Sequence, residues 1–371
     1  MRVVIIGATP HSLVNFRGEL MKAFIASGCE VIAMAGEATE QEVLSIEAIG
    51  AKFQSYPVSR NSTGLLNNLK TFFAFRKILN YHKPDVVLSY TIKPVIWTGI
   101  ALFGNNDARF NALVTGLGYA FEGQGFKREV LKRVVSLLYR LSLKKADKVI
   151  FQNEDDKDYF LLKRITQEKK VRVVNGSGVP INFFAEQPFV NKNLSFLMIA
   201  RLLNEKGVRY YVDAAKIVKE KYPETIFNLL GPYDSSPDAI SFQEVTDWVK
   251  GGEIDYLGES NDVRPFLKKC DVFVLPSYYR EGLPRTILEA MSTGRPILTT
   301  DNVGCREPII NGLNGWLVPI KDSVSLAKKM IWYIENKNKI PIMGKESRKI
   351  VEEKYDVNLV NKTMCEILGI N

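Results

Sequence analysis

The sequence contains DVFVLP over residues 271–276 and YREGLPRTILEAM over residues 279–291. The first segment is a short and mostly apolar run, which predicts a buried β-strand. Pro284 is favoured in the first turn of a helix, so the second segment predicts a glycine turn that leads into a helix. At such a helix start, the free backbone amides and the helix dipole favour a phosphate group. Together these elements predict a phosphate-binding helix start that follows a buried strand of an α/β fold.

Short β-branched segments alternate with segments of helical periodicity over nearly the whole chain, which predicts two Rossmann-like, doubly wound parallel sheets. A stretch rich in Gly, Pro and Asn at 176–193 separates two halves of similar size. We therefore expect an N-terminal domain over 1–184, a C-terminal domain over 185–351 and a helix over 352–371 that packs back on the N-terminal domain. The predicted strands are 3–6, 30–35, 85–90, 112–115, 148–152, 194–200, 226–230, 254–257, 272–276 and 296–300.

The composition excludes several classes of protein. With 371 residues, 46% of them hydrophobic and 25% charged, the chain is neither disordered nor collagen-like and is long enough for two cores. Its four cysteines show no paired spacing, and its two histidines make a histidine zinc site or a Ser/His/Asp triad improbable. The longest uncharged stretch, 3–16, is shorter than the roughly 20 residues of a membrane-spanning helix. We expect a soluble, cytoplasmic protein.

The positive charge is confined to one half of the sequence. Residues 1–185 hold 25 Lys and Arg against 16 Asp and Glu, a net charge of +9, and residues 186–371 hold 25 against 25. A nucleic acid, an anionic membrane or a phosphorylated substrate could each account for a basic first half. No nucleic-acid motif or pattern of stacking aromatics accompanies the charge, so we expect no nucleic-acid partner.

A second candidate site follows the strand predicted at 194–200. Arg201 and Lys206 lie in the segment ARLLNEKG at 200–207, where a parallel strand ends. Two cations at that place can neutralise a leaving diphosphate, a role that otherwise needs a metal ion. Ordinary surface charge is the competing interpretation.

The R-x4-K pattern of 201–206, followed by E-G-x-P-x4-E-A-M at 281–291, resembles the family 4 retaining glycosyltransferases of GT-B fold. The resemblance covers essentially the whole chain. It is strongest to the CapM-like branch, which builds capsule, O-antigen and lipid-linked glycans, through GCRE at 304–307 and NGWLVP at 314–319. It implies two domains facing each other across a cleft. It also implies transfer of a hexose or N-acetylhexosamine, galactose-type favoured, from a UDP-sugar to a polyprenyl-diphosphate-linked sugar, with no metal or other cofactor.

The resemblance also implies roles for single residues. Arg201 and Lys206 bind the donor diphosphate, Glu281 holds the hydroxyls of the donor sugar, and Glu289 binds the ribose. The remaining implied contacts are Gly282, Leu283, Gly231, Tyr256 and Leu257 with the donor, and Arg17, Gly116 and Gly118 with the acceptor.

One departure from the family pattern concerns the loop after the strand at 112–115. Many members have a histidine there, whereas this chain has Gly116 and its neighbours, with Glu122 as a possible substitute. His11, which follows the first strand and Gly7, is a candidate for catalysis, for acceptor contact or for a structural role. Arg17 could bind an acceptor phosphate or form a surface salt bridge. The D-x-D of Asp156 and Asp158 resembles a metal site, but we favour a solvated helix start.

The segment 126–148 is the candidate for membrane contact. Its apolar residues recur at helical spacing, so one face is buried, and its basic residues can lie on anionic lipid. An ordinary helix with a solvated basic face is the alternative. We expect the chain to associate with the inner face of the cell membrane. The residues expected to face it are Lys127, Arg128, Lys132, Arg133 and Arg140.

Two other functions share this fold. A sugar-nucleotide epimerase needs acid and base residues around the sugar, and the chain shows no carboxylate cluster for that purpose. A non-catalytic subunit that binds nucleotide sugars should have lost Glu281, Arg201 or Lys206, and all three are present. A glycosyltransferase is therefore the favoured function.

Overall fold

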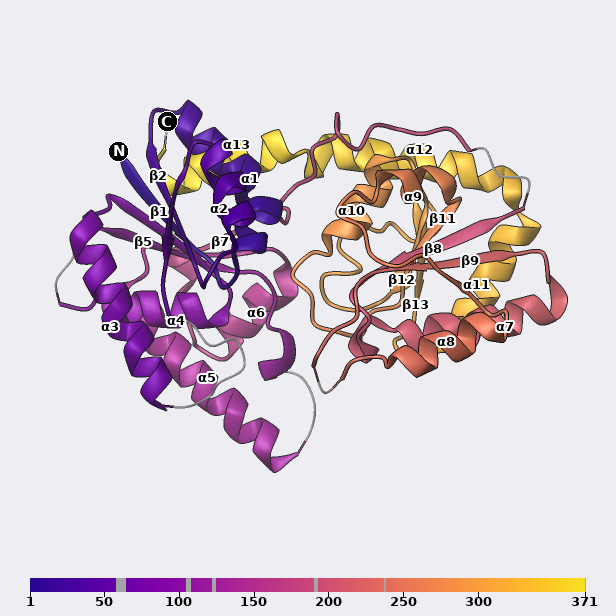
Figure 1. Ribbon diagram of the computed structural model, residues 1–371, viewed down its shortest axis with the longest axis horizontal. Helices are drawn as coiled ribbons and strands as arrows, with labels where there is room; N and C mark the ends of the chain where they lie inside the picture. The colour runs from indigo at the N-terminus through magenta and orange to yellow at the C-terminus, as the bar shows by residue number, and fades with distance from the viewer. Residues whose placement is uncertain (58–64, 105–107, 122–124, 190–192, 237, 371) are drawn as a thin grey trace. The chain divides into compact units, whose positions relative to one another are not determined.

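The computed structural model describes residues 1–57, 65–104, 108–121, 125–189, 193–236 and 238–370. The chain divides into two compact units: unit 1 comprises Met1–Ser177 and Val357–Asn371, and unit 2 comprises Gly178–Asp356. Each unit contains one parallel sheet with helices on its faces (Figure 1). The two Rossmann-like sheets predicted from the sequence are thus confirmed. The sequence placed the divisions after 184 and 351, whereas the contacts within the structure place them after Ser177 and Asp356.

The sheet of unit 1 has seven strands in the order β3-β2-β1-β4-β5-β6-β7, and each neighbouring pair is parallel. The direction of winding reverses between β1 and β4, as in a Rossmann fold. The elements are β1 (Arg2–Ile6), α1 (Pro10–Ala26), β2 (Glu30–Ala35), α2 (Glu40–Ala48), β3 (Lys52–Ser55), α3 (Leu65–His82), β4 (Val86–Tyr90), α4 (Ile92–Ala101), β5 (Arg109–Val114), α5 (Phe126–Lys145), β6 (Lys148–Phe151), α6 (Glu154–Leu162), β7 (Val171–Val173) and α13 (Val357–Leu368).

The end of the chain belongs to the core of unit 1. Met364 and Leu368 of α13 are buried in the same cluster as Leu13, Met21 and Phe24 of α1. Figure 1 shows this helix, in yellow, beside the indigo elements of the N-terminus. The residues before it, Val351–Tyr355, form a π-helical turn that belongs to unit 2.

The sheet of unit 2 repeats the Rossmann order with six parallel strands, β10-β9-β8-β11-β12-β13. Here the winding reverses between β8 and β11. The elements are β8 (Ser195–Ile199), α7 (Val208–Lys221), β9 (Ile226–Leu230), α8 (Phe242–Lys250), β10 (Asp255–Tyr256), α9 (Arg264–Lys269), β11 (Val272–Leu275), α10 (Arg285–Ser292), β12 (Ile297–Thr300), β13 (Gly315–Val318), α11 (Ser323–Glu335) and α12 (Ile340–Ile350).

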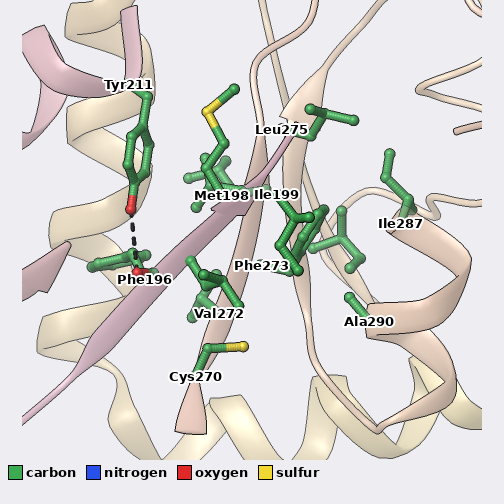
Figure 2. Close-up of a cluster of buried hydrophobic side chains, with 14 of the residues drawn as sticks. Phe196, Met198, Ile199, Tyr211, Cys270, Val272, Phe273, Leu275, Ile287 and Ala290 are labelled. Atoms are coloured by element: carbon green, nitrogen blue, oxygen red, sulfur yellow. Dashed lines mark hydrogen bonds between the residues drawn. The ribbon is translucent and has the colours of Figure 1, made fainter. Parts of the chain in front are cut away.

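The core of unit 2 surrounds the central strands β8 and β11, and side chains from helices pack against them (Figure 2). Tyr211 of α7 is fully buried, and its hydroxyl donates to the carbonyl of Phe196 at 3.2 Å, so its polar atom is satisfied inside the core. On the other side of the sheet, Ile287 and Ala290 anchor α10 with no exposed area. This packing fixes the start of α10 relative to the ends of β8 and β11.

The strands missed by the sequence analysis are β3, β7 and β13, which lie at sheet edges. β3 and β7 contain exposed and partly buried residues, and β13 has two buried and two partly buried residues, whereas β4 and β8 are fully buried. An edge strand is covered less completely than a central one, and β3 (KFQS) and β7 (VRV) accordingly lack the continuous apolar run that predicted the central strands. β13 (GWLV) is apolar but short, and its glycine is unfavourable in a strand.

Candidate functional site

In unit 2, Arg201, Lys206 and Glu281 lie in the loops that follow β8 and β11, where the winding of the sheet reverses, a place we call the switch point. Ala200 and Arg201 directly follow β8, and Pro276 and Ser277 directly follow its parallel neighbour β11. Loops at such a point diverge to opposite faces of the sheet and leave a crevice beyond the strand ends, where ligands bind in open α/β folds. The sequence analysis placed its strongest signals at this edge.

The structure brings Lys206 and Glu281 into direct contact. The Lys206 ammonium forms an ion pair with Glu281 Oε1, and both side chains are mostly buried, with 17% and 13% of their areas exposed. The Ser277 hydroxyl donates to the same oxygen at 3.2 Å. The Lys206 ammonium also lies over the Tyr279 ring, 5.3 Å from its centre. An ammonium and a carboxylate are thereby presented together at the switch point.

Glycines allow the loops of this site to approach one another. A Cβ on Gly207 would collide with the Pro276 carbonyl, and a Cβ on Gly231 would collide with the Ala200 carbonyl. Both residues also have positive φ, 83° and 153°, which disfavours other residue types. Gly231, expected to contact the donor, therefore has a structural reason of its own to be glycine.

Arg201 has a different partner from Lys206. Its guanidinium lies 2.7 Å from Asp234 Oδ2, and 44% of its side chain is exposed. The Ser236 hydroxyl, and then Arg201, hold the pKa of the Asp234 carboxyl below its ordinary value. Asp234 was not singled out in the sequence, because an aspartate in a polar loop shows no periodicity or spacing that marks it.

The helix α10 holds the second glutamate of the pattern. Glu289 is buried, and its Oε1 lies 3.0 Å from Nε of Arg285, one turn earlier on the same helix. Burial raises the pKa of Glu289 to about 7, although Arg285 opposes the shift. Pro284 was expected inside the first turn, but α10 begins at Arg285 and Pro284 is its N-cap residue. Gly282 and Leu283 precede this cap in the loop from Glu281.

Tyr256 is the last residue of the edge strand β10, which pairs with β9, and Leu257 follows it. The Tyr256 hydroxyl donates to the Gly231 carbonyl at 2.9 Å, so this tyrosine ties the β10 end to the loop after β9. The Tyr233 ring lies edge-on to it, with ring centres 5.5 Å apart. Leu257 remains 37% exposed. Partly exposed rings and an aliphatic side chain at a strand end are suited to a planar, apolar ligand group.

In unit 1, the corresponding switch point lies between β1 and β4. A Cβ on Gly7 would collide with the Tyr90 ring. The Tyr90 ring therefore occupies the space beside Gly7. The Ser12 and Tyr90 hydroxyls are hydrogen-bonded at 2.8 Å. His11, the second residue of α1, is exposed, and one of its ring nitrogens lies 2.8 Å from the Asn15 amide nitrogen.

Arg17 is not a surface residue, which corrects the salt-bridge alternative. Only 4% of it is exposed, and its guanidinium lies over the Tyr90 ring at 4.9 Å. Its Nη1 donates to the Ser177 hydroxyl at 3.1 Å, and the Gln152 amide donates to the same hydroxyl at 3.5 Å. A buried guanidinium held by a ring and a hydroxyl is pre-oriented for an anion.

The loop after β5 contains Gly116 and Gly118, which both have positive φ, 103° and 53°. Their conformations require glycine, whatever their contact with a substrate. Glu122, considered there as a substitute base, lies outside the described residues.

The D-x-D segment is not the solvated helix start that was expected. Asp156 is fully buried and accepts from the Asn153 side chain at 3.2 Å, whereas Asp158 is exposed. Residues two apart on a helix point to different sides, so these carboxylates diverge. Within the described residues, no group of three or more His, Cys, Asp or Glu is arranged to hold a metal ion.

The five basic residues predicted to face a membrane differ in exposure and in their partners. Lys127 and Arg133 are exposed and Arg128 is half-buried. Lys132 pairs with Glu129 at 3.0 Å, and Arg140 donates to the carbonyls of Lys163 and Arg164, at 2.9 and 3.1 Å, at the end of α6. The described helices include none long and apolar enough to cross a membrane.

Two residues at the switch points were missed by the sequence analysis. Ser277 shares Glu281 with Lys206, and its place directly after a buried strand could have marked it. Thr91, the first residue after β4, has a φ of 67°, which is a strained value for a β-branched residue. Its buried hydroxyl has no hydrogen-bond partner in the part of the chain that the structure describes. Nothing in the sequence marks that strain.

Comparison with known proteins places both units in one family. Residues 193–336 match the model for group 1 glycosyl transferases, and residues 14–176 match the model for the glycosyl transferase 4-like domain. A relative from Campylobacter jejuni, N,N'-diacetylbacillosaminyl-diphospho-undecaprenol α-1,3-N-acetylgalactosaminyltransferase, is 30% identical over 97% of this chain and 96% of its own length. The UDP-Gal:α-D-GlcNAc-diphosphoundecaprenol α-1,3-galactosyltransferase of Escherichia coli is 28% identical over 81% of this chain and 79% of its own.

Solved structures share the fold. A glycosyltransferase of Rickettsia africae superposes with a TM-score of 0.79 at 18% identity, over 99% of this chain and 97% of its own. The HepE protein of Anabaena, solved in complex with UDP, gives 0.78 at 19% identity over the whole of both chains. With the fold, both family models and a relative of matching length in agreement, the chain belongs to the glycosyltransferases of group 1, with a family 4-like N-terminal domain.

Proposed function

We propose that this glycosyltransferase moves a hexose or N-acetylhexosamine, galactose-type favoured, from a UDP-sugar to a sugar carried on a polyprenyl diphosphate. The observation that carries the proposal is the contact of Lys206 with Glu281 at the switch point of unit 2. The relatives from Campylobacter jejuni and Escherichia coli support it, since both are named for transfer of such sugars to diphospho-undecaprenol carriers. The product would enter a bacterial surface polysaccharide or a glycoprotein glycan.

The residues of unit 2 have complementary roles in this reaction. Lys206 and Arg201 bind the donor diphosphate, and the amides of Gly282 and Leu283 at the start of α10 assist them. Glu281 accepts hydrogen bonds from the sugar hydroxyls, while Glu289 accepts them from the ribose. Since Lys206 and Glu281 are paired in the structure, donor binding exchanges one ion pair for contacts to the diphosphate and the sugar. The ring of Tyr256 and the side chain of Leu257 lie beside the base.

We propose transfer with retention of configuration and without a metal. The relatives form α-1,3 links, and UDP-galactose is itself an α-glycoside, so the bond keeps its configuration. The leaving phosphate takes the proton of the acceptor hydroxyl on the same face of the sugar, so no separate base is required. Lys206 and Arg201 supply the positive charge that a metal ion supplies elsewhere.

We further propose that the reaction takes place at the inner face of the cell membrane, where a polyprenyl carrier is held. In unit 1, the candidates for acceptor contact are His11 and Arg17 of α1 and Gly116 and Gly118 of the segment after β5. Arg17 is suited to an acceptor phosphate because its guanidinium is held in one orientation by the Tyr90 ring and the Ser177 hydroxyl.

The test is transfer from labelled UDP-N-acetylgalactosamine, UDP-galactose, UDP-glucose and GDP-mannose to a synthetic polyprenyl-diphosphate sugar, in EDTA and then with magnesium. We expect transfer from a UDP-sugar of the galactose type in EDTA, and an α-anomer in the NMR spectrum of the product. Transfer should be lost in Lys206→Ala and kept in Lys216→Ala, whose lysine pairs with Glu253.

Three outcomes would contradict the proposal in separate ways. Dependence on magnesium would overturn the metal-free site, and a β-anomer would overturn retention. Binding of UDP without transfer to any acceptor would favour the non-catalytic subunit.

A further inference from the structure

The outward face of α5 carries a row of exposed apolar side chains. Phe126 is 85% exposed, and the four that follow it on the same face are between 39% and 52% exposed. The sequence analysis expected one buried apolar face on this segment, and for Val134, Leu137 and Leu141 that expectation is wrong. We call the whole exposed row the outer stripe: Phe126, Val130, Val134, Leu137 and Leu141.

The outer stripe is continuous along the helix. Its members are spaced by four, four, three and four positions, which keeps them on one side of an α-helix with 3.6 residues per turn. At about 1.5 Å per residue, the stripe is roughly 22 Å long. The side that packs on unit 1 is the opposite one, and it carries Val135, Tyr139, Ser142 and Leu143. The helix therefore has an apolar row on both sides.

Exposure of such an apolar row to water is unfavourable in free energy. A helix on the surface of a globular protein ordinarily shows charged and polar residues on the side away from the core. A contiguous apolar strip that faces solvent marks a site of contact with a partner or a membrane. A partner of defined chemistry is therefore expected on this side of α5.

The charge beside the stripe indicates which partner. Exposed Lys127 and Arg133 lie on its two edges, and exposed Lys144 lies at its C-terminal end. Over its whole length α5 has seven Lys and Arg residues and one acidic residue, Glu129, whose carboxylate is paired with Lys132. Apolar side chains bordered by cations match a bilayer that has apolar chains beneath anionic headgroups.

We propose that α5 lies in the headgroup region of an anionic bilayer, with the outer stripe inserted between the lipids and the basic side chains at the phosphates. The inference rests on the proposed function in one respect, because it brings the enzyme to a lipid-linked acceptor. Attachment then has two parts. The basic residues attract the chain to the surface, and the stripe holds it there by a contact that salt does not screen.

The experiment is flotation of the purified full-length chain with vesicles of phosphatidylethanolamine and phosphatidylglycerol, without donor or acceptor. The test variant is Val134→Ser with Leu137→Ser. The matched control is Val324→Ser with Ile342→Ser, which changes two side chains of similar exposure, 52% and 55%, on α11 and α12 of unit 2. Thermal melts establish that both variants fold.

We expect the wild type and the control to float, with part of the binding retained in high salt. The outer-stripe variant should partition about tenfold less, and its residual binding should vanish in salt. Failure of the wild type to float would overturn the proposal. So would binding that salt abolishes in full and that the variant leaves unchanged, or a wild-type dimer in sedimentation velocity that the variant dissociates.

Failure of this proposal can be told apart from failure of the proposed function. Transfer to a water-soluble acceptor with a short lipid chain needs no membrane, so the outer-stripe variant should keep wild-type transfer to it. A variant that floats normally but transfers nothing would count against the function and not against the membrane contact.

Discussion

At the two switch points of this enzyme, the glycines pack against different parts of the chain: backbone in unit 2 and a side chain in unit 1. In unit 2, Gly207 and Gly231 lie against the backbone carbonyls of Pro276 and Ala200. In unit 1, Gly7 lies against the ring of Tyr90, which also carries the Ser12 and Arg17 contacts. A backbone carbonyl in a strand-end loop cannot move away without displacing the loop, whereas a side chain can rotate away while the backbone stays in place. If the nucleotide binds unit 2 and the acceptor binds unit 1, as we propose, the nucleotide meets a fixed backbone geometry and the acceptor meets one that side chains define.

The largest effect is expected at the ion pair of unit 2. Glu281→Gln removes the charge that faces Lys206 and that we propose to accept from the sugar hydroxyls, so kcat should fall about 10²–10³-fold. Initial rates with saturating donor measure it. Glu253→Gln, which removes the partner of exposed Lys216, is the control and should keep the wild-type rate. An unchanged rate in Glu281→Gln would remove this residue from the reaction.

The contrast between backbone and side-chain contacts can be tested with glycine substitutions. Gly231→Ala combines a positive φ with a backbone collision and should lower the free energy of unfolding by about 3 kcal/mol or more. Gly258→Ala has a positive φ and open space, and should cost about 1 kcal/mol. Gly7→Ala should fall between them, because the Tyr90 ring can yield. Urea unfolding measures all three. A larger loss for Gly7→Ala than for Gly231→Ala would reverse the comparison.

The buried carboxyl of unit 2 should make stability depend on pH. The pKa of Glu289 rises from 4.5 to about 7, so between these values the folded state keeps a proton that the unfolded state has lost. The free energy of unfolding should therefore decrease as pH rises from about 4.5 to 7, by an amount on the order of 2–3 kcal/mol. Glu289→Gln has no charge to bury and should lack this part of the decrease. Parallel curves for both proteins would show that Glu289 titrates normally.

The smallest effect is expected in unit 1, at the D-x-D segment. Asp158→Asn changes an exposed carboxylate and should leave transfer in EDTA unchanged. Its neighbour offers the contrast, since Asp156→Asn disturbs a buried group at the start of α6 and should lower the melting temperature. Loss of transfer in Asp158→Asn that magnesium restores would identify a metal site.

Much of unit 2 was predictable because its signals are local. The ends of β8 and β11, one residue before Ala200 and Pro276, follow from apolar runs, and the cations and glycines after them are specified by residue type. The pairing of Lys206 with Glu281 was not predicted, since these residues are 75 positions apart and the sequence proposed separate ligands for them. Contact across that separation depends on β8 and β11 being neighbours in the sheet.

Unit 1 was less predictable at the level of single residues. Arg17 was assigned to the surface or to a phosphate, and the structure buries it against Tyr90. Asp156 was expected in solvent and is fully buried. In both cases burial depends on which element covers the helix, and helical spacing does not contain that information.

The sequence by itself determined the α/β class, the central strands and the place of the site at their carboxyl ends, because apolar periodicity and turn residues act over a few positions. Only the tertiary structure decided which charges pair, which glycines are required by a neighbouring backbone, and which apolar residues of α5 remain outside the core. These features arise where segments distant in sequence are packed together. Volume and burial there are set by the neighbours and not by the residue itself.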